Sequence, residues 1–200
     1  MANPDQPKGF RPMRALTGGP WTALLRRVEV ADNSSNSTNN HGDIYVGDPI
    51  TLSSGKATPA VSGGVIAGVV VGVGKANATH GEVGPFDPTT LDVAIVAKHD
   101  ETSGNYVWYV PSEFALFEVQ TASDLDLTVG SEADINVANT SAAHGDRTTG
   151  ISTVELTTNS NSDVMVVEDV SAPDNDTSLA NARHVVRFRN TLNIAAQPTS

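Results

Sequence analysis

The sequence predicts an all-β protein, an antiparallel sandwich or an open barrel with an extended N-terminal arm and long polar loops. About nine short runs rich in β-branched residues are separated by stretches of Gly, Pro, Asn, Asp and Ser. Hydrophobic residues make up 38% of the 200 residues and aromatic residues only 5%, which favours packing of small β-branched side chains. Heptads and internal repeats are not evident, so neither a coiled coil nor a repeat array is expected.

Residues 1–23 are predicted to form the extended arm. Four prolines in this segment exclude a long helix, and its large or charged side chains follow neither a helical nor a strand period. The longest apolar run within residues 1–21 is two residues, too short for a signal peptide. We therefore expect the arm to lie on a surface rather than to fold alone.

The β domain is predicted to span residues 24–190 and to begin with a strand in LLRRVEV, residues 24–30. Residues 31–43, ADNSSNSTNNHGD, contain no large apolar side chain, which predicts a flexible, exposed loop. IYVGDPITL, residues 44–52, predicts two short strand pieces with a bend at Gly47–Pro49, because Pro49 cannot donate a hydrogen bond to a ladder.

GGVIAGVVVGVGKA, residues 63–76, is apolar enough for a helix, but its glycines and β-branched residues favour a strand. LDVAIVAKHD, residues 91–100, and GNYVWYVP, residues 104–111, predict a hairpin through His99–Asn105. EFALFEVQT, residues 113–121, alternates as a further strand does.

The second half of the chain continues in the same way. Strand-like runs cover residues 149–157, 162–170 and 182–190, and turn-rich stretches separate them. A short helix is expected only within residues 123–135, where Ser123 could cap the helix and acidic residues follow. Residues 191–200 are predicted to be a C-terminal tail.

Charge is distributed unevenly around the net value of −11. Residues 1–30 hold five basic and two acidic residues, and residues 31–182 hold four basic and 21 acidic residues. Residues 183–200 hold three basic residues and no acidic residue. Either the acidic body is a solubilising surface, or the basic ends dock on an acidic partner. The acidic body argues against nucleic acid as a partner, and no apolar run approaches the length of a membrane span.

Motifs for catalysis, cofactors or metals are not convincing. GVGKA lacks the spacing of a phosphate-binding loop, and Ala76 stands where Ser or Thr would bind magnesium. The five histidines are far apart, and Asp124 and Asp126 form only a fragment of a calcium loop. Aromatic residues are few for a sugar cleft, and no GxSxG motif is present. We expect no enzyme, no cofactor, no metal and no catalytic residue.

Cysteine is absent, so disulfides cannot stabilise the chain, and burial or assembly must do so. Tyr106, Trp108 and Tyr109 form an aromatic cluster on a predicted strand. Such a cluster fills a β core or a subunit contact, or it forms a recognition patch.

Several sequence blocks, taken together and in order, carry a resemblance. They are MANPDQPKGFRP, RALTGG, YVGDPITL, GVIAGVVVGV, FEVQT, VGSEADI, TGISTVEL, APDN and the run HVVRFRN. With these blocks the chain resembles the head decoration, or cement, proteins of tailed bacteriophages, of the type encoded beside the major capsid protein in marine phages. The blocks cover most of the chain. The Asn/Ser-rich loop at residues 31–43 and the basic run HVVRFRNTLN depart from the family pattern, which leaves the attachment surface open.

The resemblance implies a non-enzymatic homotrimer that binds the major capsid protein on the outside of the head and holds neighbouring capsomers together. Such a protein is made in the host cytoplasm, which agrees with the missing signal peptide and the missing cysteines. In this interpretation the arm and the basic end of the chain contact the capsid or a neighbouring subunit. The residues expected to do so are Phe10, Arg11, Arg14, Trp21, Arg187 and Arg189.

Three alternatives stay open from the sequence. The arm could wrap its own subunit or a trimer neighbour instead of the shell. The protein could be a tail, neck or fibre-base component of the virion, which would have the same composition. It could also be a carbohydrate-binding module for host adhesion, although such a secreted module predicts a signal peptide and exposed aromatic residues.

Overall fold

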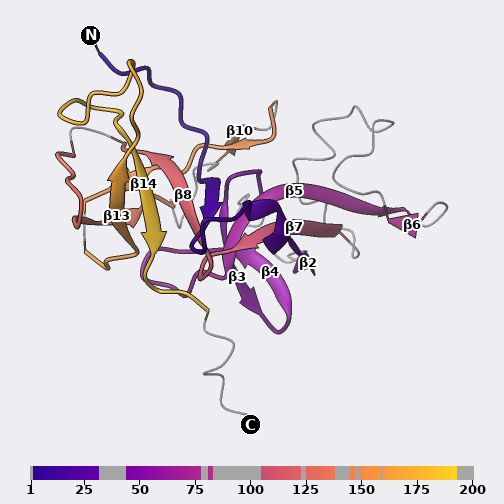
Figure 1. Cartoon of the computed structure of the whole chain (residues 1–200). Coiled ribbons are helices and arrows are strands. Elements are labelled where there is room, and N and C mark those ends of the chain that lie inside the picture. The colour runs from indigo at the N-terminus through magenta and orange to yellow at the C-terminus, as the bar shows by residue number, and fades with distance from the viewer. Residues whose placement is uncertain are drawn as a thin grey trace.

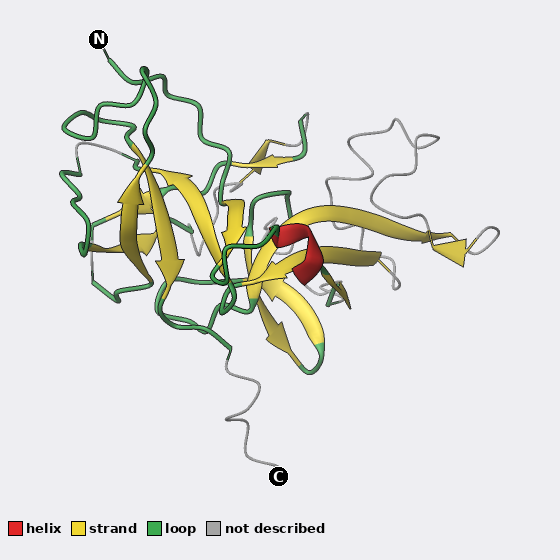
Figure 2. Ribbon diagram, viewed as in Figure 1, coloured by secondary structure: helices red, strands yellow, loops and turns green. Residues whose placement is uncertain are grey.

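The computed structural model describes residues 2–31, 44–77, 81–82, 105–122, 125–137, 145–146, 149–158 and 160–192. Strands dominate this part of the chain, and its single helical element is the 3-10 turn η1 (Trp21–Leu24), shown red in Figure 2. The strands are β1 (Arg11–Ala15), β2 (Arg26–Glu29), β3 (Pro49–Ser53), β4 (Lys56–Pro59), β5 (Gly68–Asn77), β6 (Gly81–Glu82), β7 (Asn105–Pro111), β8 (Ala115–Gln120), β9 (Glu132–Ile135), β10 (Gly145–Asp146), β11 (Ile151–Ser152), β12 (Leu156–Thr157), β13 (Val164–Asp169) and β14 (Arg183–Phe188). The predicted all-β class is confirmed.

Two large antiparallel sheets pack together as a sandwich (Figure 1). The first sheet has the order β1-β8-β14-β13-β9-β12. The second has the order β2-β7-β5-β3-β4, with β6 paired to β5, while β10 and β11 form a separate two-stranded pair. Of the two alternatives predicted from the sequence, the sandwich is the one that the structure supports.

The main hydrophobic core lies between the two sheets. Phe117 of β8 and Phe188 of β14 contact each other there with a ring-centroid distance of 5.2 Å. Val69 of β5 and Val110 of β7 enter the same core from the second sheet. The side chains that alternate toward this core along β8, β13 and β14 explain why those segments read as strands in the sequence.

A smaller core lies on the other face of the second sheet. It contains Ile50 of β3, Val70 of β5 and Val107 of β7. The chain after β2 also returns to β4, where the backbone N–H of Ala31 donates to the carbonyl of Ala57 over 2.9 Å. Since β5 is buried on both faces, its run of valines and glycines shows no alternation.

The N-terminal residues belong to the sandwich, which corrects the prediction of a separate arm over residues 1–23. β1 pairs with β8 and forms one edge of the first sheet, and β2 pairs with β7 and forms one edge of the second. The first strand of the sandwich therefore begins at Arg11 and not near residue 24. The segment is extended as predicted, but the surface on which it lies is its own chain.

A close backbone contact fixes this segment just before β1. The N–H of Phe10 donates to the carbonyl of Gly47 over 2.9 Å. Gly9 and Gly47 have φ angles of +63° and +98°, and a Cβ on either residue would lie 2.5 Å from a carbonyl oxygen of the other segment. Only glycine suits both positions, because a side chain would meet backbone atoms and would also be strained in this conformation.

The expected helix within residues 123–135 is wrong for the residues that the structure describes. Residues 125–131 are not helical, and Glu132–Ile135 forms β9, which pairs with β13. Ala133 and Ile135 both point into the main core. Side chains two residues apart share one face in a strand but not in a helix. Residues 32–43, 83–104 and 193–200 lie outside the described residues. They include nearly all of the predicted 31–43 loop, the predicted 91–100 strand with all but the last residue of its hairpin turn through His99–Asn105, and most of the predicted tail. Among the described residues, no helix has the length and apolar character needed to cross a membrane.

Candidate docking surface

Several chain segments meet at the end of the sandwich where β14 finishes, which is the lower end in Figure 1. The N–H of Leu16, after β1, donates to the carbonyl of Phe114 over 2.8 Å. The hydroxyl of Ser112 donates to the carbonyl of Ile66 over 2.6 Å. The N–H of Ile66 donates to the carbonyl of Asn190 over 2.7 Å. We call this surface the lower end and define it as residues 16–19, 25–26, 61–67, 112–114 and 189–192.

Exposed apolar side chains concentrate at the lower end. Nine large hydrophobic residues are exposed in the described part of the chain, and five of them lie here. These five are Leu16, Leu25, Val61, Val65 and Phe114, each between 36% and 42% exposed. Single exposed hydrophobic residues are ordinary on a protein surface, but a group of them on adjoining segments indicates an interaction site.

Hydrogen bonds hold the loop that carries Val61 and Val65. The buried carboxylate of Asp163 accepts from the hydroxyl of Ser62 over 2.7 Å and from the N–H of Gly63 over 2.8 Å. The side-chain amide of Asn190 donates to the carbonyls of Gly63 and Gly64 over 3.2 and 2.9 Å. The loop thus presents its two valines in one conformation, which reduces the entropy lost when a partner binds.

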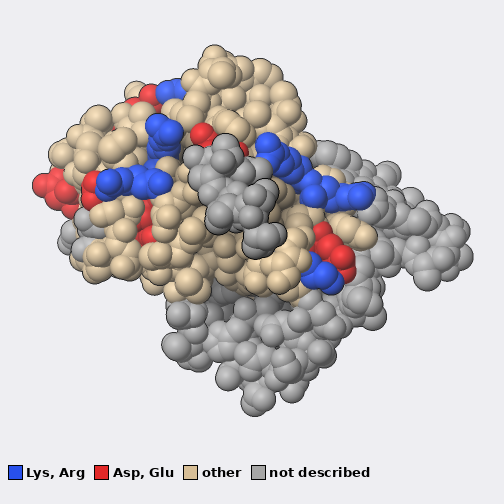
Figure 3. Space-filling model, turned by 90° about the horizontal axis from the view of Figure 1, so that it is seen from below, with Lys and Arg blue, Asp and Glu red and all other residues tan. Residues whose placement is uncertain are grey.

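Cationic side chains border these apolar residues. The guanidinium of Arg26 lies 5.9 Å from the ring centroid of Phe114, within cation–π range. Arg27, the next residue, lies 4.9 Å from the ring centroid of Tyr106. Figure 3, which views the molecule from below, shows Lys and Arg side chains on both sides of this face, with Asp and Glu side chains next to several of them. The surface therefore combines apolar contact area with charged side chains, among which Arg26 lies against Phe114.

The structure corrects the prediction that Phe10 is a partner-binding residue. Its side chain is only 1% exposed, and its ring centroid lies 4.8 Å from that of Phe188 in the main core. The prediction that Phe10 fills a pocket on a partner is therefore wrong for this structure. The sequence could not show this, because the same aromatic residue in an extended segment can anchor to its own chain or to another one.

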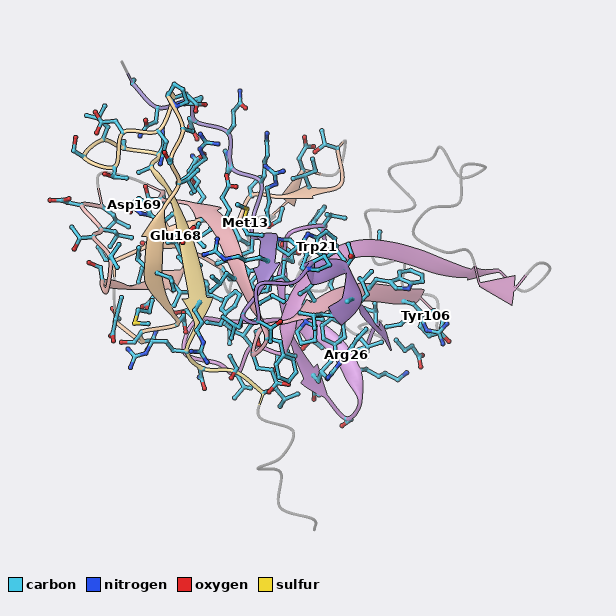
Figure 4. The ribbon with its side chains drawn as sticks, viewed as in Figure 1. Met13, Trp21, Arg26, Tyr106, Glu168 and Asp169 are labelled. Atoms are coloured by element: carbon cyan, nitrogen blue, oxygen red, sulfur yellow. The ribbon has the colours of Figure 1, made fainter. Side chains whose placement is uncertain are left out.

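The other predicted arm residues are placed differently from one another. Arg14 forms two hydrogen bonds with Glu168 of β13, so its guanidinium already has a carboxylate partner within the chain. Trp21 is half-buried against the main core, and Figure 4 shows it on the same side of the molecule as Arg26. Arg11 is exposed, but it faces Glu118 of β8, away from the lower end.

The two predicted residues near the C-terminus lie closer to the candidate surface. Arg189 belongs to the lower end, where its N–H donates to the carbonyl of Asp163 over 2.9 Å and its side chain forms an ion pair with Glu132. Arg187 is exposed on β14 and faces Met165 of β13. Of the six predicted contact residues, the structure places only Arg189 on the lower end itself.

Sequence reasoning missed the apolar residues of the lower end. Phe114 follows Pro111, Ser112 and Glu113, and a large aromatic residue in such a turn-like stretch was an available signal. Val61 and Val65 flank Ser-Gly-Gly and resemble core residues in the sequence. Their exposure depends on tertiary structure.

The aromatic cluster of β7 is divided between the two faces of its strand. Tyr109 is 6% exposed and belongs to the smaller core. Tyr106 and Trp108 are half-buried on the opposite face. Core packing thus accounts for Tyr109, and Arg27 covers Tyr106.

The described residues contain no group of three or more His, Asp or Glu side chains placed to hold a metal ion. Comparison of the chain with protein-family models, with curated proteins and with solved structures gave no match.

Proposed function

We propose that this protein is a structural component of a bacteriophage virion that binds the outer surface of the capsid through its lower end and stabilises contacts between capsomers. The observation that carries this proposal is the group of exposed apolar side chains on hydrogen-bonded segments, bordered by arginines. A surface of this kind suits a permanent protein contact better than a reaction.

The physical task fits this surface. Packed DNA stresses a phage shell outward, and a protein that bridges neighbouring capsomers opposes their separation. Apolar contacts at Phe114 and Val65 would supply contact area, while Arg26 would meet carboxylates of the major capsid protein. In this proposal the protein acts as a homotrimer, takes no cofactor and binds neither nucleic acid nor membrane.

A binding experiment tests the proposed surface. Purified protein is added to capsids that lack it, and the bound fraction is measured by co-sedimentation. The variants Val65→Asp and Phe114→Asp should reduce affinity at least tenfold, because each places a charge in an apolar contact. Leu179→Asp is the matched control, since Leu179 is 36% exposed, close to the 40% of Val65 and the 42% of Phe114, but lies in the loop before β14. Equal binding by all four proteins would contradict the proposal.

Electron microscopy of virions tests the location. The proposal expects copy numbers comparable to those of the major capsid protein and density on the outside of the head. A few copies at the tail or neck would instead support the alternative of a tail, neck or fibre-base component.

A further inference from the structure

A contact at the other end of β8 joins the N-terminal segment to the body of the protein. The side chain of Gln120 is 5% exposed and is fully engaged. Its Nε2 donates to Oδ1 of Asp5 over 3.3 Å and to Oε1 of Glu155 over 3.1 Å, and its Oε1 accepts from the N–H of Gln6 over 3.3 Å. The Nε2 atom of Gln120 thus contacts both carboxyl groups. The accepting oxygens of Asp5 and Glu155 can therefore be no farther apart than these two N–O distances added together.

Charging both of these neighbouring carboxyl groups costs free energy, because two negative charges repel each other. Partial burial and the negative charge of Asp5 raise the pKa of Glu155 to about 7, while the hydrogen bond from Gln120 opposes this rise. At neutral pH Glu155 is therefore close to the midpoint of its titration. A small change in pH changes the charge beside Asp5.

Other charged groups surround this contact. A cavity of about 170 Å³ lies beside Gln120. The charged residues that line it are Lys8, Arg11, Glu118, Asp174 and Arg183. Arg183 donates to Asp174 over 2.7 Å and lies 3.5 Å from Glu118, so its charge is already balanced. Asp5 remains the charged neighbour that acts on Glu155.

Two firm anchors flank the Asp5 contact. On one side, the side-chain amide of Asn3 donates to the carbonyls of Asp176 and Ala180 over 2.8 and 2.9 Å. On the other side, Gly9 and Phe10 are fixed against Gly47. Residues 4–8 span these anchors, and four of the five, all except Pro7, are exposed.

We propose that Asp5, Gln120 and Glu155 form a pH-sensitive latch that holds residues 4–8 against the body when Glu155 is neutral and releases them when it is charged. In the closed state the Glu155 carboxyl accepts a proton more readily than it would in the open state, where its pKa returns toward the ordinary 4.5. Closure therefore weakens as the pH rises from about 4.5 to about 7, and it changes little above that range.

Spin-label mobility measures the latch directly. The chain has no cysteine, so Gln6→Cys provides one labelling site on the exposed segment. We expect the immobilised fraction of the label to fall with increasing pH, with a midpoint near the pKa of Glu155. Adding Glu155→Gln should keep the label immobilised at every pH, and adding Asp5→Asn should shift the midpoint to lower pH. Glu113→Gln, a carboxyl removed at the lower end, is the matched control and should behave as the parent.

A second measurement keeps the proposal testable if a variant folds poorly. Carbon-13 NMR of the Glu155 carboxyl in the unmodified chain should show titration near pH 7. Titration at the ordinary value of a glutamate would overturn the proposal. So would label mobility that does not change with pH, or a Glu155→Gln protein that retains the pH dependence of its parent.

Discussion

Arg14 of β1 and Glu168 of β13 are joined by two hydrogen bonds, of 3.1 and 2.7 Å, across the two strands that separate them. Arg14 faces Leu116 of β8, and Glu168 faces Val185 of β14, so the ion pair crosses the sheet on the face that carries these two apolar residues. Leu116 and Val185 are only 5% and 2% exposed. The pair ties the edge strand β1 to the middle of the first sheet.

Removing Arg14 should change the pH dependence of stability. The hydrogen bonds and charge of Arg14 lower the pKa of Glu168 below its ordinary value. A carboxylate of this kind stabilises the folded state above its unfolded pKa, and this contribution is lost as the pH falls through its folded pKa. Arg14→Met should therefore be less stable than the parent at pH 7, and the difference should shrink toward about pH 3. Urea unfolding at both pH values checks this, and an equal difference at the two would contradict it.

The close approach of Gly9 and Gly47 should make both positions intolerant of a side chain. Gly9→Ala and Gly47→Ala should each lower the free energy of unfolding by ~3 kcal/mol or more, because the new Cβ meets backbone oxygen and is also strained. Gly55→Ala is the matched control, since Gly55 has a φ of +77° with open space around it. That change should cost only ~1–2 kcal/mol. Similar losses in all three variants, measured by urea unfolding, would show that the contact contributes nothing.

Substitutions of Phe10 and Phe114 should distinguish effects on folding stability from effects on capsid binding. Phe10→Ala should cost about 3–5 kcal/mol of folding stability, because it empties a buried site beside Phe188. Phe114→Ala should change stability by under about 0.5 kcal/mol, because the side chain is 42% exposed, yet it should weaken capsid binding. Thermal unfolding and co-sedimentation with capsids measure the two effects. A Phe114→Ala protein that binds as its parent does would place the docking surface elsewhere.

The arginines of the lower end should make capsid binding sensitive to salt. Arg26→Gln should weaken binding several-fold at low ionic strength and less at high ionic strength, since exposed charge pairs are screened. Arg11→Gln removes the same charge away from the lower end and serves as the control. If both variants lose the same affinity, net charge rather than a specific contact accounts for the effect.

The proposed homotrimer can be checked by measuring the molar mass of the protein. Light scattering should give three times the 20.8 kDa of one chain, in solution or once the protein is released from capsids. A reconstruction of the virion should show the copies in groups of three. Single copies at capsomer centres would contradict the trimer.

Strands could be predicted where one face is buried, and β8, β13 and β14 agree with their predicted runs. The valines of β5 were also assigned to a strand, although burial of both faces removes the alternation that normally identifies one. β9 was missed because acidic residues and a possible cap suggested a helix, while the pairing of Glu132 and Ala133 with β13 decided the outcome. Local preference is weak where tertiary pairing competes with it.

The candidate site was harder to predict than the fold. Composition drew attention to charged and aromatic residues of the N-terminal segment. Whether Phe10 packs in its own core or on a partner, however, depends on the close contact between Gly9 and Gly47. The lower end gathers Leu16, Val65 and Phe114 from segments far apart in the chain. A single sequence gives no measure of which apolar residues remain uncovered after such segments meet.

The pairing of β1 with β8 also sets an order of events during protein synthesis. Arg11 lies opposite Glu118, so the first edge strand leaves the ribosome about a hundred residues before its partner exists. Until then Phe10 and the strand edge stay exposed to other chains, which favours misassembly among crowded nascent proteins. β14 lies between β8 and β13 and comes later still, so the first sheet can close only when synthesis has passed Phe188. Completion of the sandwich must therefore be a late step, and slow translation would prolong the period in which the N-terminal strand has no partner.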